Sequence, residues 1–547
     1  MATLSGVCTT NCGGEIRKTG LENSISAGYK IINDANLQNL NQELGCKLGS
    51  SSDVLQKNLA TAMITRVEPL INRRSVIMKF RVAPKSEIWN SRFYRLAEIE
   101  NDLLKFFKEG GPDENSLEND SIAQLSFGND FLKPFNQVPF MIMLISLFKI
   151  WVVPTMTILT PIIAWIVPYI LLRFVYALPI NQQEYVRILQ GMWAGDMALP
   201  NVNIPAPDMW TPRSIFQFIL FGFSFAQSMI QPIQNAMHLY KTDTVLVGLG
   251  TRLIELRQII EEFRAETKDM PITLTNLLDD LDPADPRRAF MLIKEQPGRI
   301  HAALRDLAQL EVLWRISQAK AFNPVMFKPD TFSLEDMVDV SLKDGVASSL
   351  TLSEKSQRHA IITGPNGGGK SSFLRATLQC TLLAHTYGMA PAKKAIMPRF
   401  LWIASGLQLR DTPGVYSMFE TEVKFAADCA RSARRGPGPG LVLFDELFHS
   451  TNPPDGARSA EVFLRQLWAP ESSAYSVIST HVFPLVDKKP DNVQAICCAG
   501  KEAPDGSIVY SYKAEPGICR VSSVRTVWDN FGLLKLRGRG AEGKVSR

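Results

Sequence analysis

The sequence Ile361-Ile362-Thr363-Gly364-Pro365-Asn366-Gly367-Gly368-Gly369-Lys370-Ser371-Ser372 lies between a short β-rich run and an apolar helical pattern. It fills the G-x-x-x-x-G-K-[ST] pattern of a phosphate-binding (Walker A) loop, in which glycines let backbone N–H groups close on phosphate oxygens. We predict that Gly364 to Ser372 bind a nucleotide, with Lys370 reaching the β- and γ-phosphates and Ser371 offering its hydroxyl to Mg²⁺. The alternative is a glycine-rich turn before a helix, which the motifs below disfavour.

A second motif, Leu441-Val442-Leu443-Phe444-Asp445-Glu446, is an apolar run that ends in two carboxylates. Such a run is typical of a buried parallel strand, and ligands of open α/β sheets bind at the carboxyl ends of the strands. We predict that Asp445 holds Mg²⁺ through water and that Glu446 orients and deprotonates the water that attacks the γ-phosphate. The run alone is weak evidence, but it follows the Walker A loop at the separation expected for two halves of one site.

A third run, Ser476 to Ser479, leads into Thr480-His481. A lone histidine is more often structural than catalytic. This one follows the strand after the two carboxylates, which favours a catalytic role for His481 in sensing the γ-phosphate.

Composition sets limits on the protein class. The chain has 547 residues, enough for two to four domains, and its formal charge of +5 does not by itself predict a nucleic-acid binder. Its eight cysteines form no regular framework, which favours a reducing, intracellular setting. Cys8, Cys12 and Cys46 lack a fourth metal ligand, so a flexible terminus is the favoured interpretation. Residues 1–25 lack the pattern of a signal peptide.

An apolar block interrupts the polar helical patterns. The segment from Ile150 to Leu172 has no charged residue, and Lys149 separates it from the apolar run 138–148. This is long enough to cross a bilayer, and membranes tolerate the interior prolines that cost about 3 kcal/mol each in soluble helices. We predict membrane association through 138–172 as one span or a tight hairpin, assisted by 215–233. The alternative is a buried helical hairpin in a globular core.

Four motifs resemble, in the same order, those of the MutS family of DNA mismatch-repair ATPases. The Walker A loop resembles T-G-P-N-M-G-G-K-S-T, with Gly367 and Ser372 as departures. Residues 445–456 resemble D-E-x-G-R-G-T-S-x-x-D-G, 417–422 resemble S-x-F-x-x-E, and 479–481 resemble A-T-H. No L-S-G-G-Q is present, which argues against ABC transporters. The likeness is strong over 345–485 and fainter over 30–110 and 300–535.

The resemblance implies an ATP hydrolase that uses ATP and Mg²⁺ and that forms a homodimer or heterodimer through its ATPase domain. Ser417 of one subunit would close over ATP held by Lys370 of the other. It also implies mismatched or branched DNA as partner, with hydrolysis coupled to dimer closure in mismatch repair or recombination. Two departures stand out: no counterpart of the family's mismatch reader is expected, and Phe448-His449-Ser450 replaces G-R-G. The alternative function is a membrane-tethered ABC-type motor or scaffold outside mismatch repair.

We therefore predict a multidomain α and α/β protein, in which a helical MutS-like core carries an apolar helical insertion and is followed by a C-terminal ABC-type P-loop ATPase domain. It would be membrane-associated or otherwise soluble at DNA. The predicted segments are a disordered N-terminus (1–27), the first part of the helical core (28–110), the apolar insertion (111–250), returning core and lever helices (251–328), the ATPase domain (329–535) and a basic tail (536–547).

Overall fold

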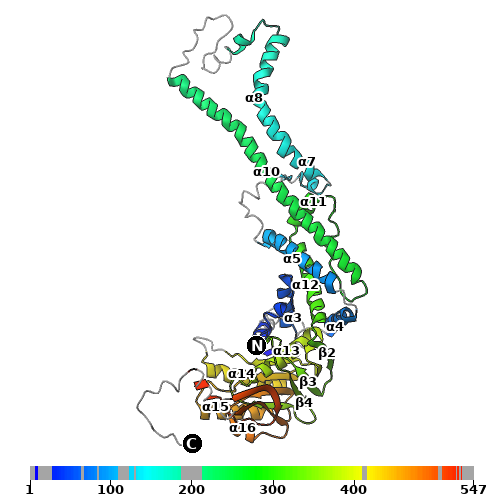
Figure 1. The fold of residues 1–547 in the computed structure, drawn as a ribbon, viewed down its shortest axis with the longest axis vertical. Helices are drawn as coiled ribbons and strands as arrows, with labels where there is room; N and C mark the ends of the chain where they lie inside the picture. The colour runs from blue at the N-terminus through cyan, green and yellow to red at the C-terminus, as the bar shows by residue number, and fades with distance from the viewer. Residues whose placement is uncertain are drawn as a thin grey trace. The chain divides into compact units, whose positions relative to one another are not determined.

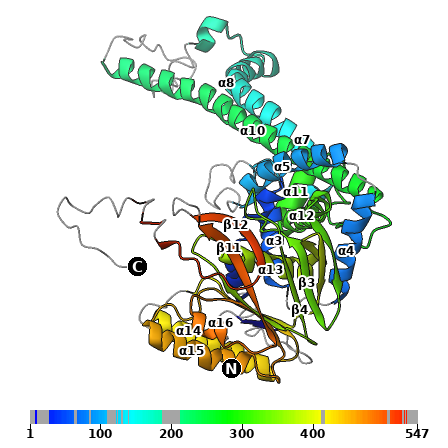
Figure 2. The ribbon, with the colours of Figure 1, turned by 60° about the horizontal axis from the view of Figure 1, so that its bottom comes forward.

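The chain combines helical and α/β parts (Figures 1 and 2). It divides into two compact units, of which unit 1 contains both helical and α/β parts and unit 2 is helical. Unit 1 comprises residues 1–97, 263–274 and 304–547, and unit 2 comprises residues 98–262 and 275–303. The computed structural model describes residues 7–9, 27–62, 67–82, 86–108, 122, 124–127, 131–138, 140–186, 212–409, 416–502, 508–524, 527–528 and 531. The predicted basic tail lies outside these residues, as does the predicted N-terminal segment apart from residues 7–9 and 27.

Unit 1 contains a seven-stranded sheet in which five neighbouring strands run parallel. Its central strands β5, β9 and β10 are buried at every residue, as expected of strands covered on both faces. In order across the sheet, the strands are β1 (Val7–Thr9), β8 (Trp402–Gly406), β9 (Gly440–Phe444), β10 (Ala474–Ser479), β5 (His359–Thr363), β11 (Val493–Glu502) and β12 (Ile508–Pro516). The first and last of these pair antiparallel with their neighbours.

The register of the central strands brings their carboxyl ends to one edge of the sheet. Strand β10 lies between β9 and β5, with Ile478 opposite Phe444 on one side and Ser479 opposite Ile362 on the other. The residues that follow these three strands therefore meet at the edge where α/β sheets bind ligands.

Helices pack on this sheet through apolar side chains (Figure 2). Phe425 and Phe463 both contact Phe444 of β9, with ring centroids 5.4 and 6.3 Å away. The prolines at 453 and 454 occupy the first positions of a helix, where no backbone N–H donor is required, and Asn452 caps it by accepting from the N–H of Asp455. The helices of this region are α13 (Lys370–Tyr387), α14 (Met418–Arg435), α15 (Pro453–Leu467) and α16 (Phe483–Asp487).

A second sheet of five strands lies in the same unit, and α13 contacts strands of both sheets. The end of α13 is held by other parts of unit 1: Arg73 donates to the carbonyl of Thr386, and Asn58 to the hydroxyl of Tyr387. Gln379, in the middle of α13, donates to the carbonyl of Ala35. The strands of the second sheet, in order, are β4 (Ser348–Ser353), β3 (Thr331–Met337), β7 (Lys394–Met397), β2 (Phe322–Phe327) and β6 (Met389–Pro391).

The helical part of unit 1 is held by an aromatic cluster and one buried carboxylate. Trp89 packs edge-on against Phe263, and the ring centroids of Trp89 and Trp314 are 6.2 Å apart. Glu311 is fully buried and accepts from the backbone N–H of Leu48 and the hydroxyl of Ser51, which satisfies its charge. This part consists of α2 (Leu40–Glu43), α3 (Ser50–Ala60), α4 (Val67–Val82), the start of α5 (Ser86–Lys108), and the end of α12 (Gly298–Gln318).

Unit 2 contains one continuous apolar helical stretch and most of a long helix, α10 (Pro212–Glu266) (Figure 1). The stretch runs through α7 (Met141–Leu147), a π-helical turn, η2 (Phe148–Val152), helix α8 (Val153–Ile170) and a second π-helical turn, η3 (Leu171–Val175). Asp243 of α10 holds Arg287 through two bonds of 2.7 and 2.8 Å. Unit 2 also contains η1 (Lys133–Gln137), α11 (Pro286–Glu295), the end of α5 and the start of α12.

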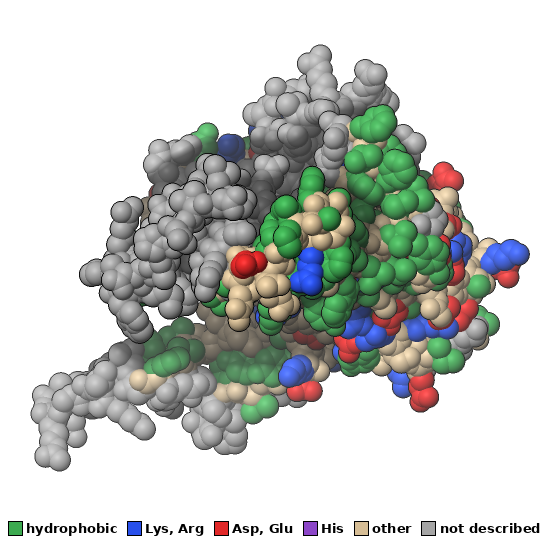
Figure 3. All heavy atoms as spheres, turned by 90° about the horizontal axis from the view of Figure 1, so that it is seen from above, with side chains coloured by type: hydrophobic (Ala, Val, Ile, Leu, Met, Phe, Trp, Pro, Cys, Tyr) green, Lys and Arg blue, Asp and Glu red, His purple; other side chains and the backbone are tan. Residues whose placement is uncertain are grey.

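Most exposed side chains of this apolar stretch are hydrophobic, and Thr155, Thr157, Thr160 and Arg173 are exposed as well. Among the described residues, Met141–Thr160 alone is a helical stretch of sufficient length and hydropathy to cross a bilayer, and 17% of it is buried. Core helices of soluble proteins also meet the length and hydropathy criteria, but they are mostly buried. The space-filling view shows broad green areas with isolated charged side chains between them (Figure 3).

Candidate nucleotide-binding site

The Walker A residues form the turn between β5 and α13. Gly364, Gly367 and Gly369 have φ angles of +152°, +80° and +100°, which residues with a side chain rarely adopt. A Cβ atom on Gly364 would also lie 2.6 Å from the carbonyl oxygen of Cys498. The loop therefore closes tightly over the sheet edge and directs the start of α13 toward the space above it.

Lys370 folds back into this loop. Its ammonium donates to the carbonyl oxygens of Gly364 and Pro365, at 3.0 and 3.1 Å, and to Asn366 Oδ1 at 3.4 Å. Burial lowers the pKa of Lys370, and the charges of Glu446 and Asp445 oppose that shift. A cation is thus placed inside a ring of backbone groups, as phosphate binding requires.

Ser479 connects the two acidic residues that follow β9, through the side chain of one and the backbone of the other. Its hydroxyl donates to Asp445 Oδ1 and accepts from the backbone N–H of Glu446 at 2.8 Å. Glu446 has a φ of +52°, a left-handed conformation that costs a non-glycine residue about 1–3 kcal/mol and is often found at functional sites. This serine lies at the end of β10, so the strand order itself places the bridge.

His481 stands beside the second carboxylate. Its Nε2 atom lies 3.6 Å from Glu446 Oε1, and its side chain is half-exposed. Burial and the positive charge of Lys370 lower the pKa of His481, while Glu446 and Asp445 oppose the shift. The neutral imidazole is therefore favoured next to the predicted base.

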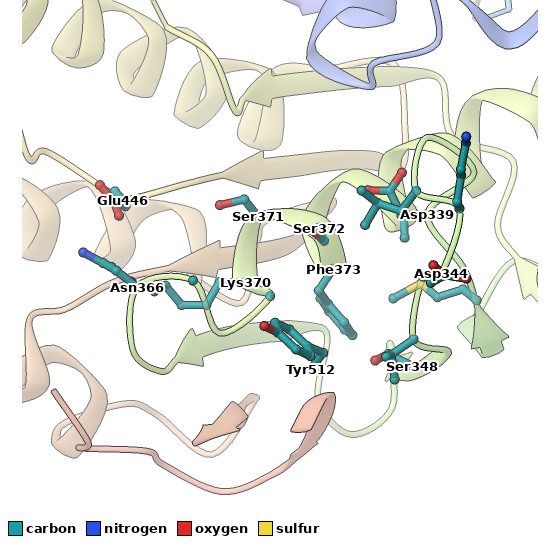
Figure 4. Close-up of a pocket in the computed structure, with 18 residues that line it drawn as sticks. Asp339, Asp344, Ser348, Asn366, Lys370, Ser371, Ser372, Phe373, Glu446 and Tyr512 are labelled. Carbon is teal, nitrogen blue, oxygen red and sulfur yellow. Dashed lines mark hydrogen bonds between the residues drawn. The ribbon is translucent and has the colours of Figure 1, made fainter. Parts of the chain in front are cut away.

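These groups border a cavity of about 570 Å³ (Figure 4). Figure 4 shows Lys370, Ser371 and Glu446 toward one end of the cavity, with Asp344 and Ser348 toward the other. Asp445 and His481 are not among the lining residues, and they reach the cavity through their contacts with Ser479 and Glu446. The predicted residues that line it are Asn366, Gly367, Gly369, Lys370, Ser371, Ser372 and Glu446.

Two parts of the wall were not predicted from the sequence. One is Tyr512 of β12, whose ring lies beside that of Tyr510, with centroids 5.7 Å apart. The Tyr510 hydroxyl donates to the carbonyl of Asn366 at 3.2 Å, which ties β12 to the Walker A loop. Their spacing of two residues places both rings on one face of a strand. This alternation is the sequence pattern from which the pair could have been predicted.

The other part is the segment between β3 and β4. Asp339 is buried, and Arg375 of α13 donates to its Oδ2 atom at 2.7 Å. Gln379 donates to Asp339 Oδ1 at 2.8 Å and accepts from the N–H of Val340 at 3.0 Å. This network fixes the wall to the helix that starts at Lys370. No motif in the sequence marks it.

Ser417 begins α14 and does not line the cavity. Its hydroxyl accepts from the N–H of Glu420 at 3.3 Å, and the Glu420 carboxylate accepts from the N–H of Ser417 at 2.8 Å. This reciprocal pair is a capping box, which gives α14 a defined start. The N-terminus of α14 is thus a preformed group of donors, and the predicted action of Ser417 on a second subunit stays a prediction.

Two oxygen donors are of the kind that Mg²⁺ prefers. Ser371 supplies a hydroxyl at the cavity wall and Asp445, outside the lining, supplies a carboxylate; Mg²⁺ typically takes one or two protein ligands together with water and phosphate oxygens. Within the described residues, no group of three or more His, Cys, Asp or Glu side chains could hold a metal by itself. Of the cysteines considered for a metal site, Cys12 lies outside those residues.

Comparison with known proteins identifies this region. Residues 360–531 match the family model described as MutS domain V. Similar proteins named DNA mismatch repair protein MutS come from Thermus thermophilus, 31% identical over 33% of this chain and 22% of the relative; from Thermus aquaticus, 32% identical over 30% and 20%; and from Leuconostoc mesenteroides, 25% identical over 41% and 27%. The chain thus matches about a fifth to a quarter of the length of these relatives.

Proposed function

Residues 360–531 of this chain are a MutS-family domain V, and on that premise we propose that the protein binds ATP with Mg²⁺ and hydrolyses it. One observation carries the proposal: the buried ammonium of Lys370 and the carboxylate of Glu446 border the same cavity. A phosphate-binding cation and a candidate base at one cavity are the two parts that phosphoryl transfer to water requires.

Each residue has a defined task in this reaction. Lys370 and the loop N–H groups bind the phosphates, and Ser371 and Asp445 hold Mg²⁺, which neutralises charge on the phosphate oxygens. Glu446 orients the attacking water and accepts its proton, while His481 holds the Glu446 carboxylate in place and senses the γ-phosphate. Ser479 keeps Asp445 and Glu446 in register, because its hydroxyl contacts both.

The finer part of the proposal concerns assembly. Ser417 is the exposed cap of α14 and does not line its own cavity, which supports a role at the nucleotide of a second subunit. Two such subunits, identical or different, would close when ATP fills both sites. Closure is the step that would couple hydrolysis to a change in the helical part of unit 1.

DNA is the proposed partner. The support is the name of the relatives, which are DNA mismatch repair proteins, although each match covers under a third of the relative. We propose binding of mismatched or branched duplexes, with a role in repair or recombination. Duplex, mismatched and branched DNA should then stimulate the ATPase, and the effect should weaken as salt rises.

The test of the hydrolytic site is Glu446→Gln, which keeps the size of the side chain and removes the base. It should bind ATP like the wild type and lose turnover by about a hundredfold or more. Glu461→Gln on the surface of α15 is the matched control, and it should leave both unchanged. Equal hydrolysis in Glu446→Gln and the wild type would remove the proposed mechanism.

A second candidate function, a membrane-tethered motor or scaffold, is favoured by the polarity of unit 2. A cavity of about 490 Å³ between α8 and α10 is bordered by Lys149, Thr157, Gln231 and Asn235 among others. Large apolar side chains are exposed along α7, η2, α8 and the first half of α10, which is unusual for helices in water and typical of helices in lipid. Exposed examples are Leu147, Phe148, Trp151, Met156, Ile162, Ile163, Ile166, Phe216, Ile219, Phe223 and Ile230.

Internal hydrogen bonds also suit a lipid environment. The hydroxyls of Thr155, Thr157 and Thr160 donate to carbonyl oxygens four residues earlier, at 2.6, 2.8 and 2.7 Å. Lipid offers no partners, so polar groups there must be satisfied within the helices. The uncharged run between Lys149 and Arg173 spans about 35 Å of helix, close to the ~30 Å core of a bilayer.

Fractionation tests this candidate. The full chain should sediment with membranes, resist alkaline extraction and dissolve in detergent. Replacing outward apolar residues of α8, as in Ile162→Lys/Ile166→Lys, should release it into the soluble fraction because each charge opposes insertion by about 3 kcal/mol. A wild-type protein that is soluble without detergent would exclude the membrane tether and leave the ATPase proposal intact.

A further inference from the structure

A buried carboxylate on α14 contacts the loop that follows the two catalytic-site carboxylates. Glu422 is fully buried, and its Oε2 atom accepts from the hydroxyl of Ser450 at 2.7 Å. Its other oxygen, Oε1, lies 3.2 Å from Nδ1 of His449. Removing a carboxylate from water is costly unless partners compensate it. These two residues of one loop are therefore the partners that keep Glu422 in place.

His449 has a second acceptor. Its Nδ1 atom also lies 3.0 Å from the backbone carbonyl oxygen of Glu446. The Glu446 carbonyl oxygen can only accept, so Nδ1 carries a proton and donates to it, while Glu422 Oε1 lies within ion-pair distance of the same nitrogen. One imidazole nitrogen thus lies between the backbone of the proposed base and a side chain on α14.

The loop needs such support because its backbone is strained. Glu446 and Phe448 have φ angles of +52° and +53°, each at a cost of about 1–3 kcal/mol, and such residues persist only where surrounding contacts hold them. Phe448 is buried beside Phe444 and Phe463, which anchors the apolar side of the loop. The polar side is held by the contacts of His449 and Ser450 with Glu422.

Ser450 and His449 favour the charged form of Glu422. Burial raises the pKa of Glu422, and the Ser450 hydrogen bonds and the charge of His449 oppose that shift. The side chain of His449 is 54% exposed. The carboxylate of Glu446 is engaged separately, by His481 at 3.6 Å.

We propose that Glu422 and His449 are positioning residues that hold the backbone of Glu446 and thereby couple the catalytic carboxylate to α14. This inference rests on the proposed ATPase function. Ser417 caps the same helix that carries Glu422 in its second turn. When a second subunit engages Ser417, a displacement of α14 would reach Glu446 through His449. The link would make hydrolysis at one nucleotide depend on engagement of the other.

The experiment compares His449→Ala, which removes the donor, with His449→Asn, whose amide nitrogen can occupy the position of Nδ1. In the full-length protein, His449→Ala should lower kcat about ten- to a hundredfold, because a small misplacement of a catalytic group costs that much. ATP affinity should stay within about twofold, since the link does not touch the phosphate loop. His449→Asn should recover most of the lost kcat, which a purely structural loss would not explain.

Glu422→Gln provides an independent arm. It should lower kcat, and adding it to His449→Ala should cause little further loss, because both changes break one link. His301→Ala on α12 is the control substitution and should leave kcat unchanged. Thermal unfolding of every variant identifies any that fail to fold, in which case Glu422→Gln and His449→Asn decide.

Two results would overturn the inference: an unchanged kcat in His449→Ala or Glu422→Gln, or equal loss in His449→Ala and His449→Asn. Failure of the ATPase proposal is distinguished by Glu446→Gln. If that variant hydrolyses ATP like the wild type, the proposed function is wrong. If it is inactive while His449→Ala is fully active, only the coupling inference is wrong.

Discussion

The region around the candidate nucleotide site of unit 1 and the helix pair of unit 2 differ in how they place their apolar side chains. In the first, strands such as β9 are wholly buried and polar groups gather at a cavity on the sheet edge. In the second, polar and apolar side chains both border a cavity between α8 and α10, and many large apolar side chains are exposed. In water the hydrophobic effect favours the first arrangement. The contrast supports the proposal that the two regions meet different surroundings.

The largest expected difference comes from matched truncations in the two regions. Leu443→Ala in β9 removes a fully buried side chain and should lower the free energy of unfolding of the ATPase region by about 2–5 kcal/mol. Leu159→Ala in α8 removes a side chain that is 38% exposed and should change it by under about 1 kcal/mol. Urea unfolding in detergent, monitored through ATP binding, measures both. Equal losses would break the comparison.

Acid should weaken the first region because it buries neutral histidines. In His385, Nδ1 donates to the carbonyl of Thr381 and Nε2 accepts from the N–H of Phe400, and burial lowers its pKa to about 4. The unfolded chain binds this proton near pH 6.5, so stability is full above that pH and falls between pH 6.5 and 4, by about 2 kcal/mol at pH 5.

Unfolding free energies at pH 7 and pH 5 check this effect. The variant His385→Gln should lose less stability on acidification than the wild type, whereas the exposed His301→Gln should lose the same amount. An identical acid response in all three proteins would show that His385 is not the group that titrates.

Removal of the Ser479 hydroxyl, which contacts both Asp445 and Glu446, should have a moderate effect. Ser479→Ala deletes a hydroxyl bound to Asp445 and to the N–H of Glu446, and bonds to charged groups contribute about 1.5–3 kcal/mol. We expect kcat to fall at least about tenfold with little change in ATP affinity. Ser476→Ala on the same strand is not a neutral control, since its hydroxyl contacts His359, and neither is Ser473→Ala, whose hydroxyl donates to the carbonyls of Ala433 and Gly438. A weaker ATP affinity with unchanged kcat would argue against the bridge.

The smallest effect is expected at the wall of the cavity. Tyr510→Phe removes one hydroxyl that donates to the Asn366 carbonyl at 3.2 Å, and a neutral hydrogen bond contributes about 0.5–1.5 kcal/mol. Nucleotide affinity should weaken severalfold at most, measured by titration with a fluorescent ATP analogue. Tyr416→Phe, outside the cavity, should show no change.

The parts of the site that could be predicted are those formed within short stretches of sequence. The loop from Gly364 to Ser372 carries its own conformational requirement in its glycines, and Asp445 and Glu446 follow a strand that is apolar throughout. Each of these local patterns determines where its residues point. Homology of residues 360–531 to domain V agrees with the family resemblance.

What could not be predicted depends on neighbours distant in the chain. Ser479 contacts the Asp445 carboxylate and the Glu446 N–H only because β10 lies beside β9, an order that no single stretch encodes. Tyr512 reaches the cavity from β12 of one sheet, and Asp339 from the segment after β3 of the other. The role of Ser417 requires a second chain, and the domain boundaries and the membrane assignment remain predictions.

Helix α13 has a mechanical consequence. Its first residue, Lys370, holds the candidate phosphate site, and its last residues are gripped by Arg73 of α4 and Asn58 of α3. An α-helix resists compression along its axis, so α13 can transmit a displacement from one of these ends to the other. A change in the phosphates at one end would then move α3 and α4 at the other end, through the 18 residues of α13.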